Sequence, residues 1–122
     1  MAHVQPEILE SFKLMWNLYP SPVFLVHKDR DILATNKAAQ GLGINAGIKC
    51  HSLCENQKVC PGCKANVSLK KNEGVRQLAF SSYSNMFMDG YWIPVDGVDD
   101  VYVHFGNDIT EYVKPELLEG QK

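Results

Sequence analysis

The sequence predicts an α+β fold in which an antiparallel sheet of five strands is covered on one face by helices. Three observations lead to this prediction. Apolar residues near the N-terminus recur at spacings of three and four, as on one face of a helix. Two short apolar runs follow, separated by a polar turn, and three long strand-like runs occupy much of the C-terminal half. A chain that keeps most of its helices and strands in separate stretches is typical of the α+β class.

The first element is an amphipathic helix that ends before Pro20 and Pro22. Its apolar face is formed by Ile8, Phe12, Met15, Trp16 and Tyr19. Such a face packs either on the protein's own sheet or against a second copy of the chain. We therefore assign residues 1–19 to an N-terminal helical segment.

The next two elements are short strands that form a hairpin. Val23–His27 and Ile32–Thr35 are apolar, and the polar stretch Lys28–Asp31 between them is the predicted turn. Asn36 follows at once, where its side chain suits the N-cap of a short helix that ends at Gly41.

The middle of the chain has the weakest pattern. Residues 45–60 show neither the helical nor the strand period. Pro61 suits the first turn of a further helix, which is predicted to run to Lys71 and to stop at residues 72–74.

Three long strands are predicted in the remainder, at Val75–Ser84, Met86–Val95 and Val98–Ile109. The Asp96–Gly97 pair predicts a two-residue hairpin turn, and Pro94 should lie near a strand end because it lacks an N–H group. The last strand alternates, with Val101, Val103 and Phe105 facing one way and Tyr102 and His104 the other.

Composition limits the classes of protein to consider. The chain has 122 residues, enough for one domain, and its 12 basic and 14 acidic residues give a net charge of −2. The sequence has no basic cluster of the kind that indicates nucleic-acid binding. No stretch approaches the roughly 18 apolar residues of a membrane span. The N-terminus does not have the pattern of a secretory signal, so we expect a cytoplasmic protein.

The order of several motifs resembles that of PAS domains. These motifs are YPSPVFLV, then DILATNKAA with Asn36 after the second strand, then three long strands and a closing DITEYV that begins at Asp108. The resemblance covers roughly residues 8–113. It implies a five-stranded antiparallel sheet in the order 2-1-5-4-3, with helices that enclose a small pocket.

The resemblance also implies a division of the chain and a role. Residues 20–113 would form the sensor domain and residues 114–122 a C-terminal tail. PAS domains sense ligands, oxygen, redox state or light, commonly dimerise through N-terminal helices, and often signal through a helix after the last strand. Pro115 interrupts the place where that signalling helix would follow the last strand, so we expect a free-standing sensor or an excised input domain.

Four cysteines lie within fourteen residues, at Cys50, Cys54, Cys60 and Cys63. In a reducing compartment, clustered cysteines favour a metal site over structural disulfides. Four thiolates suit a tetrahedral zinc ion, which we favour, or an iron–sulfur cluster. His51 is an alternative ligand, and a bacterial PAS subgroup has a similar Cys…Cys-x-x-Cys segment.

Other roles for the cysteines stay open. A thiol–disulfide switch or a small thiol oxidoreductase would use the Cys60–Cys63 pair. Four free, partly buried thiols are the simplest alternative. A dimerisation module that senses nothing is a further one.

The resemblance places a ligand pocket between the sheet and the helices. Its candidate residues are Phe24, Leu33, Met88, Tyr91, Trp92 and His104. If the Tyr102–His104 side of the last strand faces the helices, His104 lines this pocket and titrates near neutral pH; otherwise it faces solvent. A Met- and aromatic-rich stripe such as that of the fourth strand is usually core, and in a PAS-like fold it could also line a cofactor pocket or a dimer surface.

These observations together predict a sensor and not an enzyme. Its input would be a small-molecule ligand, oxygen or redox state. The expected partners are a second copy of the chain, bound through the N-terminal helix or a sheet face, and a downstream signalling protein. Neither nucleic acid nor a membrane is expected as a partner.

Overall fold

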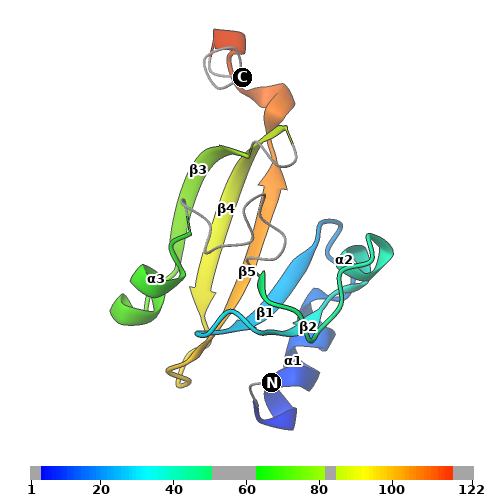
Figure 1. The fold of residues 1–122 in the computed structure, drawn as a ribbon, viewed down its shortest axis with the longest axis vertical. Helices are drawn as coiled ribbons and strands as arrows, with labels where there is room; N and C mark the ends of the chain where they lie inside the picture. Colours follow the sequence, from blue (N-terminus) through cyan, green and yellow to red (C-terminus); the bar gives the residue numbers. More distant parts are fainter. Residues whose placement is uncertain (1–3, 51–62, 82–84, 117–122) are drawn as a thin grey trace.

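The structure, a computed structural model, describes residues 4–50, 63–81 and 85–116. Its centre is one five-stranded sheet in the order β2-β1-β5-β4-β3, and every neighbouring pair is antiparallel (Figure 1). The strands are β1 Val23–His27, β2 Ile32–Thr35, β3 Val75–Ser81, β4 Met86–Pro94 and β5 Val101–Asp108. The predicted α+β class and strand order are confirmed.

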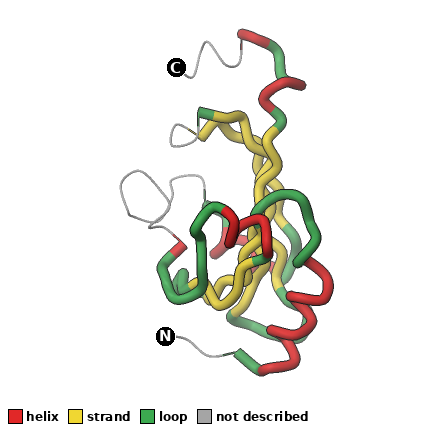
Figure 2. Tube along the Cα trace, turned by 90° about the vertical axis from the view of Figure 1, so that its right-hand side faces the viewer, coloured by secondary structure: helices red, strands yellow, loops and turns green. Residues whose placement is uncertain are grey.

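Helices cover both faces of this sheet. They are α1 Pro6–Trp16, α2 Lys37–Gly41 and α3 Ala65–Lys71, with a 3-10 turn η2 at Thr110–Tyr112. Helices α2 and α3 pack on one face, as expected, whereas α1 packs on the other, on the right of the sheet in Figure 2. We call the face under α2 and α3 the inner face and the face under α1 the outer face. None of the described helices is long and apolar enough to cross a lipid bilayer.

Each face has its own apolar core, because the side chains of β5 alternate between them. The outer core consists of Phe12, Val23, Leu25, Leu33, Ala34, Val101 and Phe105. The inner core consists of Phe24, Val26, Ile32, Ala39, Ala65, Trp92 and Tyr102. The predicted alternation of β5 is confirmed, and the Tyr102–His104 side faces the helices α2 and α3.

Asn36 joins the N-terminal segment to the hairpin. Its Oδ1 accepts hydrogen bonds from the backbone N–H of Ala39 at 3.1 Å and of Val23 at 2.9 Å. Its Nδ2 donates to the backbone oxygens of residues 16, 19 and 21 at 3.1, 3.3 and 2.9 Å. The predicted N-cap role is therefore confirmed, and the same side chain also holds the segment between α1 and β1.

The turn between β4 and β5 is longer than the two residues predicted. Strand β4 ends at Pro94 and β5 begins at Val101, three residues later than Val98. The backbone N–H of Lys28 binds the oxygen of Asp100 at 2.8 Å, which draws the turn toward the end of β1. Pro94 lies at the strand end, as its missing N–H group required.

Three further predictions need correction or fall outside the described residues. Pro115 was predicted to interrupt a helix, but residues 115 and 116 are helical, because proline fits the first turn of a helix. The helix predicted to start at Pro61 begins only at Ala65, since residues 63 and 64 are not helical; Pro61 itself and the predicted end of β3 at Ser84 lie outside the described residues.

Candidate functional site

Arg30 is a buried cation in the turn between β1 and β2. Only 6% of the residue is exposed, and its φ of 80° lies in the left-handed region that favours glycine. Its Nη1 donates to the backbone oxygen of Lys28 at 2.7 Å, and its Nη2 donates to Oδ1 of Asn66 in α3 at 3.2 Å. The side chain therefore crosses from the hairpin turn to the first turn of α3.

The charge of Arg30 lacks the usual compensation. Among the described residues, no carboxylate lies within ion-pair distance of its guanidinium, and its buried Nε has no hydrogen-bond partner. Buried charges in proteins are normally paired because removing them from water is costly. Within the described residues the guanidinium is held by two neutral acceptors, the backbone oxygen of Lys28 and the side-chain oxygen of Asn66.

Cys50 and Cys63 lie on the same face of the sheet. The backbone N–H of Cys50 donates to the backbone oxygen of Arg30 at 2.7 Å. Cys63 lies two residues before α3, the helix that Arg30 reaches through Asn66. Both cysteines are half-buried free thiols that pack against the inner core.

Backbone pairing explains the position of Cys50. Residues 47–50 run beside the start of β2: the N–H of Gly47 binds the oxygen of Ile32 at 2.9 Å, and the N–H of Ile32 binds the oxygen of Ile48 at 2.9 Å. A backbone fixed at three successive points leaves the Cys50 side chain little freedom. Residues 45–60 showed no sequence period, and these hydrogen bonds hold the N-terminal part of that stretch, up to Cys50, against the β1–β2 hairpin.

Tyr102, on β5, lies on the same inner face as Arg30, Cys50 and Cys63. It is fully buried, and among the described residues its hydroxyl makes no hydrogen bond of full geometry, although the side chain of Arg30 lies near enough to interact with it. Burial raises the pKa of the Tyr102 hydroxyl, and the neighbouring Cys50 adds to this, whereas Arg30 opposes it. Arg30, Tyr102, Cys50 and Cys63, which we call the inner polar cluster, are thus close enough to affect one another's charge.

The thiol of Cys50 is held in its neutral form in the metal-free protein. Burial, helped by the neighbouring Cys63 and opposed by Arg30, raises the pKa of Cys50 to about 11. Because the folded pKa exceeds that of an unfolded cysteine, about 8.5, the neutral thiol stabilises the fold below that pH. This contribution is lost as the pH rises toward the folded value.

Alkylation of metal-free protein tests this. Between pH 7 and pH 9.5 we expect the rate at Cys50 to keep rising about tenfold per pH unit, because the thiolate fraction is still far from saturation. The urea-unfolded chain is the control, and its rate should level off above about pH 8.5. Mass spectrometry of the Cys50 peptide gives both rates. Levelling in the folded protein at the same pH would contradict the burial of this thiol.

His104 lies next to the cluster on the same strand face as Tyr102. Its ring stacks on Trp92 at 4.7 Å and lies 6.3 Å from the ring of Phe24, both measured between centroids. Its Nδ1 donates to the backbone oxygen of Tyr91 at 2.8 Å. Burial lowers the pKa of His104, and Arg30 adds to this effect, so the ring is neutral at pH 7.

The six predicted pocket residues divide between the two faces. Phe24, Trp92 and His104 meet on the inner face. Met88 shares that face, and its Cε lies only 3.0 Å from where a β-carbon on Gly106 would stand. Leu33 belongs to the outer core, and Tyr91 stacks on Phe105 there at 5.0 Å between ring centroids. The structure thus places four of the six on the inner face, and three of these, Phe24, Trp92 and His104, lie close to one another.

Of the predicted metal ligands, the structure brings Cys50 and Cys63 to one place. Cys54, Cys60 and His51 lie outside the described residues. Within the described ranges, no three His, Cys, Asp or Glu side chains are grouped as a metal site would need. Sequence reasoning missed Arg30 and Tyr102; the available signal was an arginine in a tight turn, where glycine or asparagine is usual.

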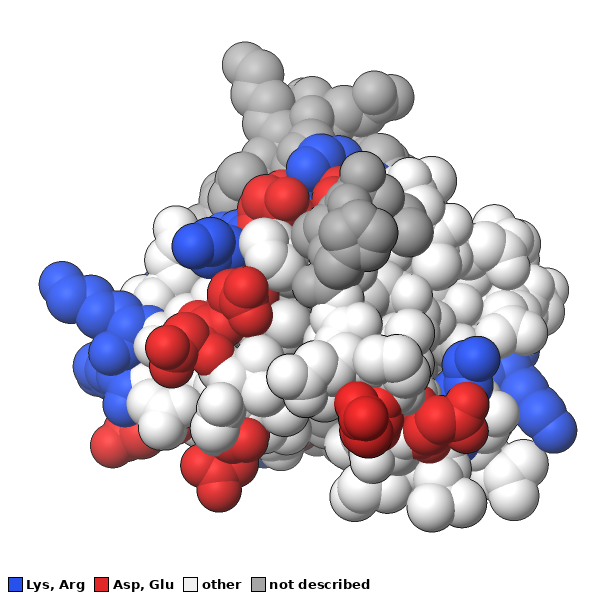
Figure 3. Space-filling view, turned by 90° about the horizontal axis from the view of Figure 1, so that it is seen from below, with Lys and Arg blue, Asp and Glu red and all other residues white. Residues whose placement is uncertain are grey.

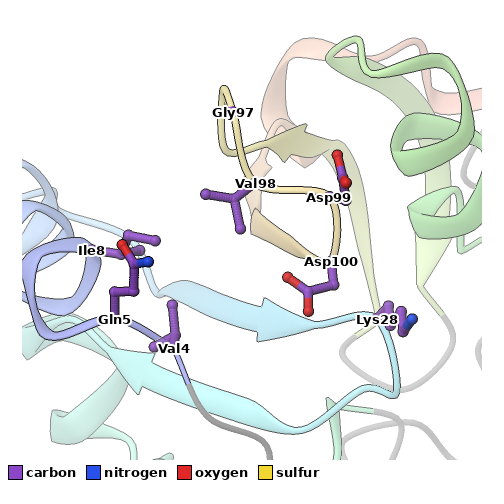
Figure 4. A pocket seen from close by; sticks show the side chains of 8 residues that line it. All are labelled: Val4, Gln5, Ile8, Lys28, Gly97, Val98, Asp99 and Asp100. Carbon is purple, nitrogen blue, oxygen red and sulfur yellow. The ribbon is translucent and has the colours of Figure 1, made fainter.

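Hollows elsewhere on the surface hold none of the predicted ligands. A polar hollow of about 420 Å³ lies between the residues before α1 and the β4–β5 turn (Figure 4). There Lys28 and Asp100 line one side, and Asp100 Oδ2 lies 3.3 Å from His27 Nε2. In the view of Figure 3, acidic and basic side chains are dispersed and form no continuous basic patch.

An apolar groove of about 370 Å³ runs between α1 and the outer face of the sheet. Met15, which the sequence assigned to the apolar face of α1, lines this groove and is 73% exposed because the groove is open. Leu14 and Leu18 are also largely exposed. The end of α1 thus presents an unpaired apolar surface.

No known protein family matches the sequence in a profile comparison, and no curated protein is similar to it in sequence. Solved structures are similar in fold. The PAS domain of Bordetella pertussis BvgS has a TM-score of 0.63, with 17% identity over 94% of each chain. A domain of an HTR-like protein from Haloarcula marismortui ATCC 43049 has a TM-score of 0.57, with 19% identity over 75% of this chain and 99% of that one.

An RNA-binding Light-Oxygen-Voltage receptor is also similar, with a TM-score of 0.60 and 18% identity over 95% of this chain and 36% of that chain. At such identities the likeness concerns the fold. The strand order β2-β1-β5-β4-β3 agrees with the order that the PAS resemblance implied. The protein therefore has the fold of a PAS domain.

Proposed function

We propose that this protein is a sensory PAS domain, not an enzyme, whose input is received at a cysteine–metal centre on the inner face. The observation that carries the proposal is the buried guanidinium of Arg30, which has no carboxylate partner among the described residues and lies near two half-buried cysteines from separate segments. A metal ion bound by four thiolates has a net negative charge, which this cation would balance. The donor set and its surroundings therefore fit such a centre.

Cys50 and Cys63 would hold the metal from the two ends of the segment, and Cys54 and Cys60 would complete the ligand set. Zinc, which we favour, would fix residues 50–63 against the sheet and stabilise the domain. An iron–sulfur cluster would instead supply a redox-active group. In either case Arg30 balances charge, and the Trp92–His104 stack excludes water from the neighbouring face.

A response at this site would reach the rest of the domain through β1, β2 and β5. Arg30 lies in the turn that joins β1 to β2, and Tyr102 lies on β5. The 3-10 turn η2 follows β5, and at this junction the backbone N–H of Thr110 donates a hydrogen bond to Oδ1 of Asp108. On the opposite face the same sheet carries α1 and its exposed apolar end. We propose that this end joins two copies of the chain, so that movement of the sheet alters the dimer and its downstream contact in the cytoplasm.

Metal analysis with an ultraviolet–visible spectrum tests the proposal on protein purified anaerobically without added metal. We expect about one metal centre per chain. Zinc without visible absorbance would make the centre structural and move the search for the signal to the rest of the inner face, around the Trp92–His104 stack. Iron with sulfide and a band near about 400 nm would make the cysteines the detector.

Substitution of one ligand sharpens the same test. Cys60→Ser and Cys63→Ser should each lose the bound metal and loosen residues 45–65, while the sheet keeps its far-ultraviolet circular dichroism. Leu42→Ser is the control, because Leu42 is 69% exposed and precedes the same segment. Unchanged metal content in both cysteine variants would refute a shared four-cysteine site.

A thiol–disulfide switch is the second candidate, since Cys50 and Cys63 lie close enough to affect each other's charge. The raised pKa of Cys50 makes it a slow nucleophile at neutral pH, which favours the metal centre. Metal-free protein in which a free-thiol count falls by two on mild oxidation would support the switch instead.

A further inference from the structure

The two edges of the sheet differ in what covers them. At β2, residues 47–49 run beside the strand: the N–H of Gly47 binds the oxygen of Ile32 at 2.9 Å, and the N–H of Ile32 binds the oxygen of Ile48 at 2.9 Å. At β3, which forms the left border of the sheet in Figure 1, no described residue pairs with the free side of the strand. An open edge offers its backbone N–H and C=O groups to another strand.

The register of β3 on β4 shows which backbone groups point away from the sheet. The backbone oxygen of Gln77 lies 3.5 Å from where a β-carbon on Gly90, its partner in β4, would stand, so the backbone groups of Gln77 face β4. Because this direction alternates along a strand, the backbone groups of Arg76, Leu78 and Phe80 point outward. The oxygen of Leu78 accepts a hydrogen bond from the side chain of Gln77 at 3.3 Å, which agrees with this direction. Three outward positions are therefore available for pairing.

Strand β3 lacks the features that usually protect an open edge. Its seven residues include no proline, and they pair with β4 without a register shift, so no bulge twists the edge away. Its one charged side chain, that of Arg76, is neutralised by Asp89, with 2.6 Å between Nε and Oδ1 and 3.2 Å between Nη2 and Oδ2. Leu78 is 47% exposed and follows Arg76 on the outer face. A regular, uncharged edge of this kind favours pairing with another strand.

We propose that β3 pairs with β3 of a second copy of the chain, antiparallel and centred on Leu78, so that the two sheets continue into one. A second copy fits this edge because a two-fold axis at Leu78 brings all three outward residues of one edge to those of the other. Arg76 of each copy then lies opposite Phe80 of the other, so that no like charges meet, and the two exposed Leu78 side chains cover each other. This contact is separate from the α1 contact proposed above and does not depend on the cysteines.

Amide hydrogen exchange at low and high protein concentration tests the pairing, with sedimentation velocity measuring self-association in parallel. The amides of Gln77 and Ala79 face β4, so they should be protected at every concentration. Those of Arg76, Leu78 and Phe80 should become protected only as the copies associate. Outward amides that exchange freely in the associated protein would overturn the inference. Outward amides that are equally protected in the monomer would also overturn it, because the chain itself would then cover the edge.

Two substitutions of Leu78 sharpen the test. Leu78→Pro removes an outward N–H group but no bond to β4, so it should weaken self-association through β3 by about 10–100-fold while the circular dichroism stays unchanged. Leu78→Lys places two positive charges opposite each other and should weaken it without a change in the backbone.

Leu18→Lys is the control, because Leu18 is 85% exposed beside the end of α1 and belongs to the other proposed contact. In this variant the concentration-dependent protection of Leu78 should persist. If both Leu78 variants associate as strongly as the unchanged protein and Leu18→Lys does not, the pairing of β3 fails and the α1 contact stands. If only the Leu78 variants lose association, β3 pairing stands and the α1 contact fails.

Discussion

Replacing Asn36 with alanine is expected to lower the free energy of unfolding by about 3–5 kcal/mol, through the loss of a buried polar network. Asn36 is fully buried and takes part in five hydrogen bonds with backbone groups. Alanine would leave the N–H groups of Val23 and Ala39, and three carbonyl oxygens, without that partner. Denaturant unfolding followed by circular dichroism measures the change.

Two further substitutions define the cause. Asn36→Asp keeps the acceptor but places a carboxylate beside the three carbonyl oxygens that Nδ2 now serves, so it should also be strongly destabilising. Asn45→Ala is the matched control, because Asn45 is exposed and its side chain makes a single long bond of 3.5 Å to Gly43. A loss under about 1 kcal/mol for Asn36→Ala would mean that water replaces the amide.

Phe105→Ala is expected to cost about 3–5 kcal/mol and to release α1 from the sheet. Phe105 is 7% exposed, and its ring lies 5.2 Å from Trp16, 5.6 Å from Tyr19 and 5.0 Å from Tyr91 between centroids. These aromatic contacts join the end of α1 to β4 and β5. Their loss leaves a cavity that the surrounding rings cannot close without moving the helix.

Limited proteolysis separates the two effects of this substitution. We expect cleavage near residues 17–20 to become faster than global unfolding explains, and Trp16 fluorescence to shift toward that of an exposed indole. Tyr112→Ala removes an aromatic ring that is 79% exposed, and it should change neither stability nor cleavage. Equal protection of α1 in both variants would show that Phe12, and not Phe105, holds the helix in place.

Local patterns predicted the elements well where one or a few neighbouring residues decide the backbone. The bounds of β1 and β2 were predicted correctly because polar turn residues and Asn36 mark their ends. The N-cap of α2 was also predicted correctly, since capping depends on one side chain and the next three residues. Part of the candidate site was predicted in the same way, through the spacing of the cysteines.

Predictions that depended on distant contacts were less accurate. The β4–β5 turn was predicted as two residues from Asp96–Gly97, but β5 begins only at Val101, where the hydrogen bond from Lys28 to the backbone oxygen of Asp100 continues the pairing of β5 with β1. Leu33 and Tyr91 were assigned to the pocket, and the sheet places both on the outer face. In each case the deciding contact joins residues far apart in the sequence, which a local pattern does not contain.

The sequence by itself determined the strands, the short helices, the PAS-like order and the cluster of four cysteines, because these follow from periodicity, caps and spacing. Only the tertiary structure decided that α1 covers the outer face, and that Arg30 is buried beside Cys50 with no carboxylate partner among the residues that the structure describes. The physical reason is that burial and charge pairing depend on which segments meet in space. A guanidinium in a polar turn looks solvated in sequence, and the fold removes it from water.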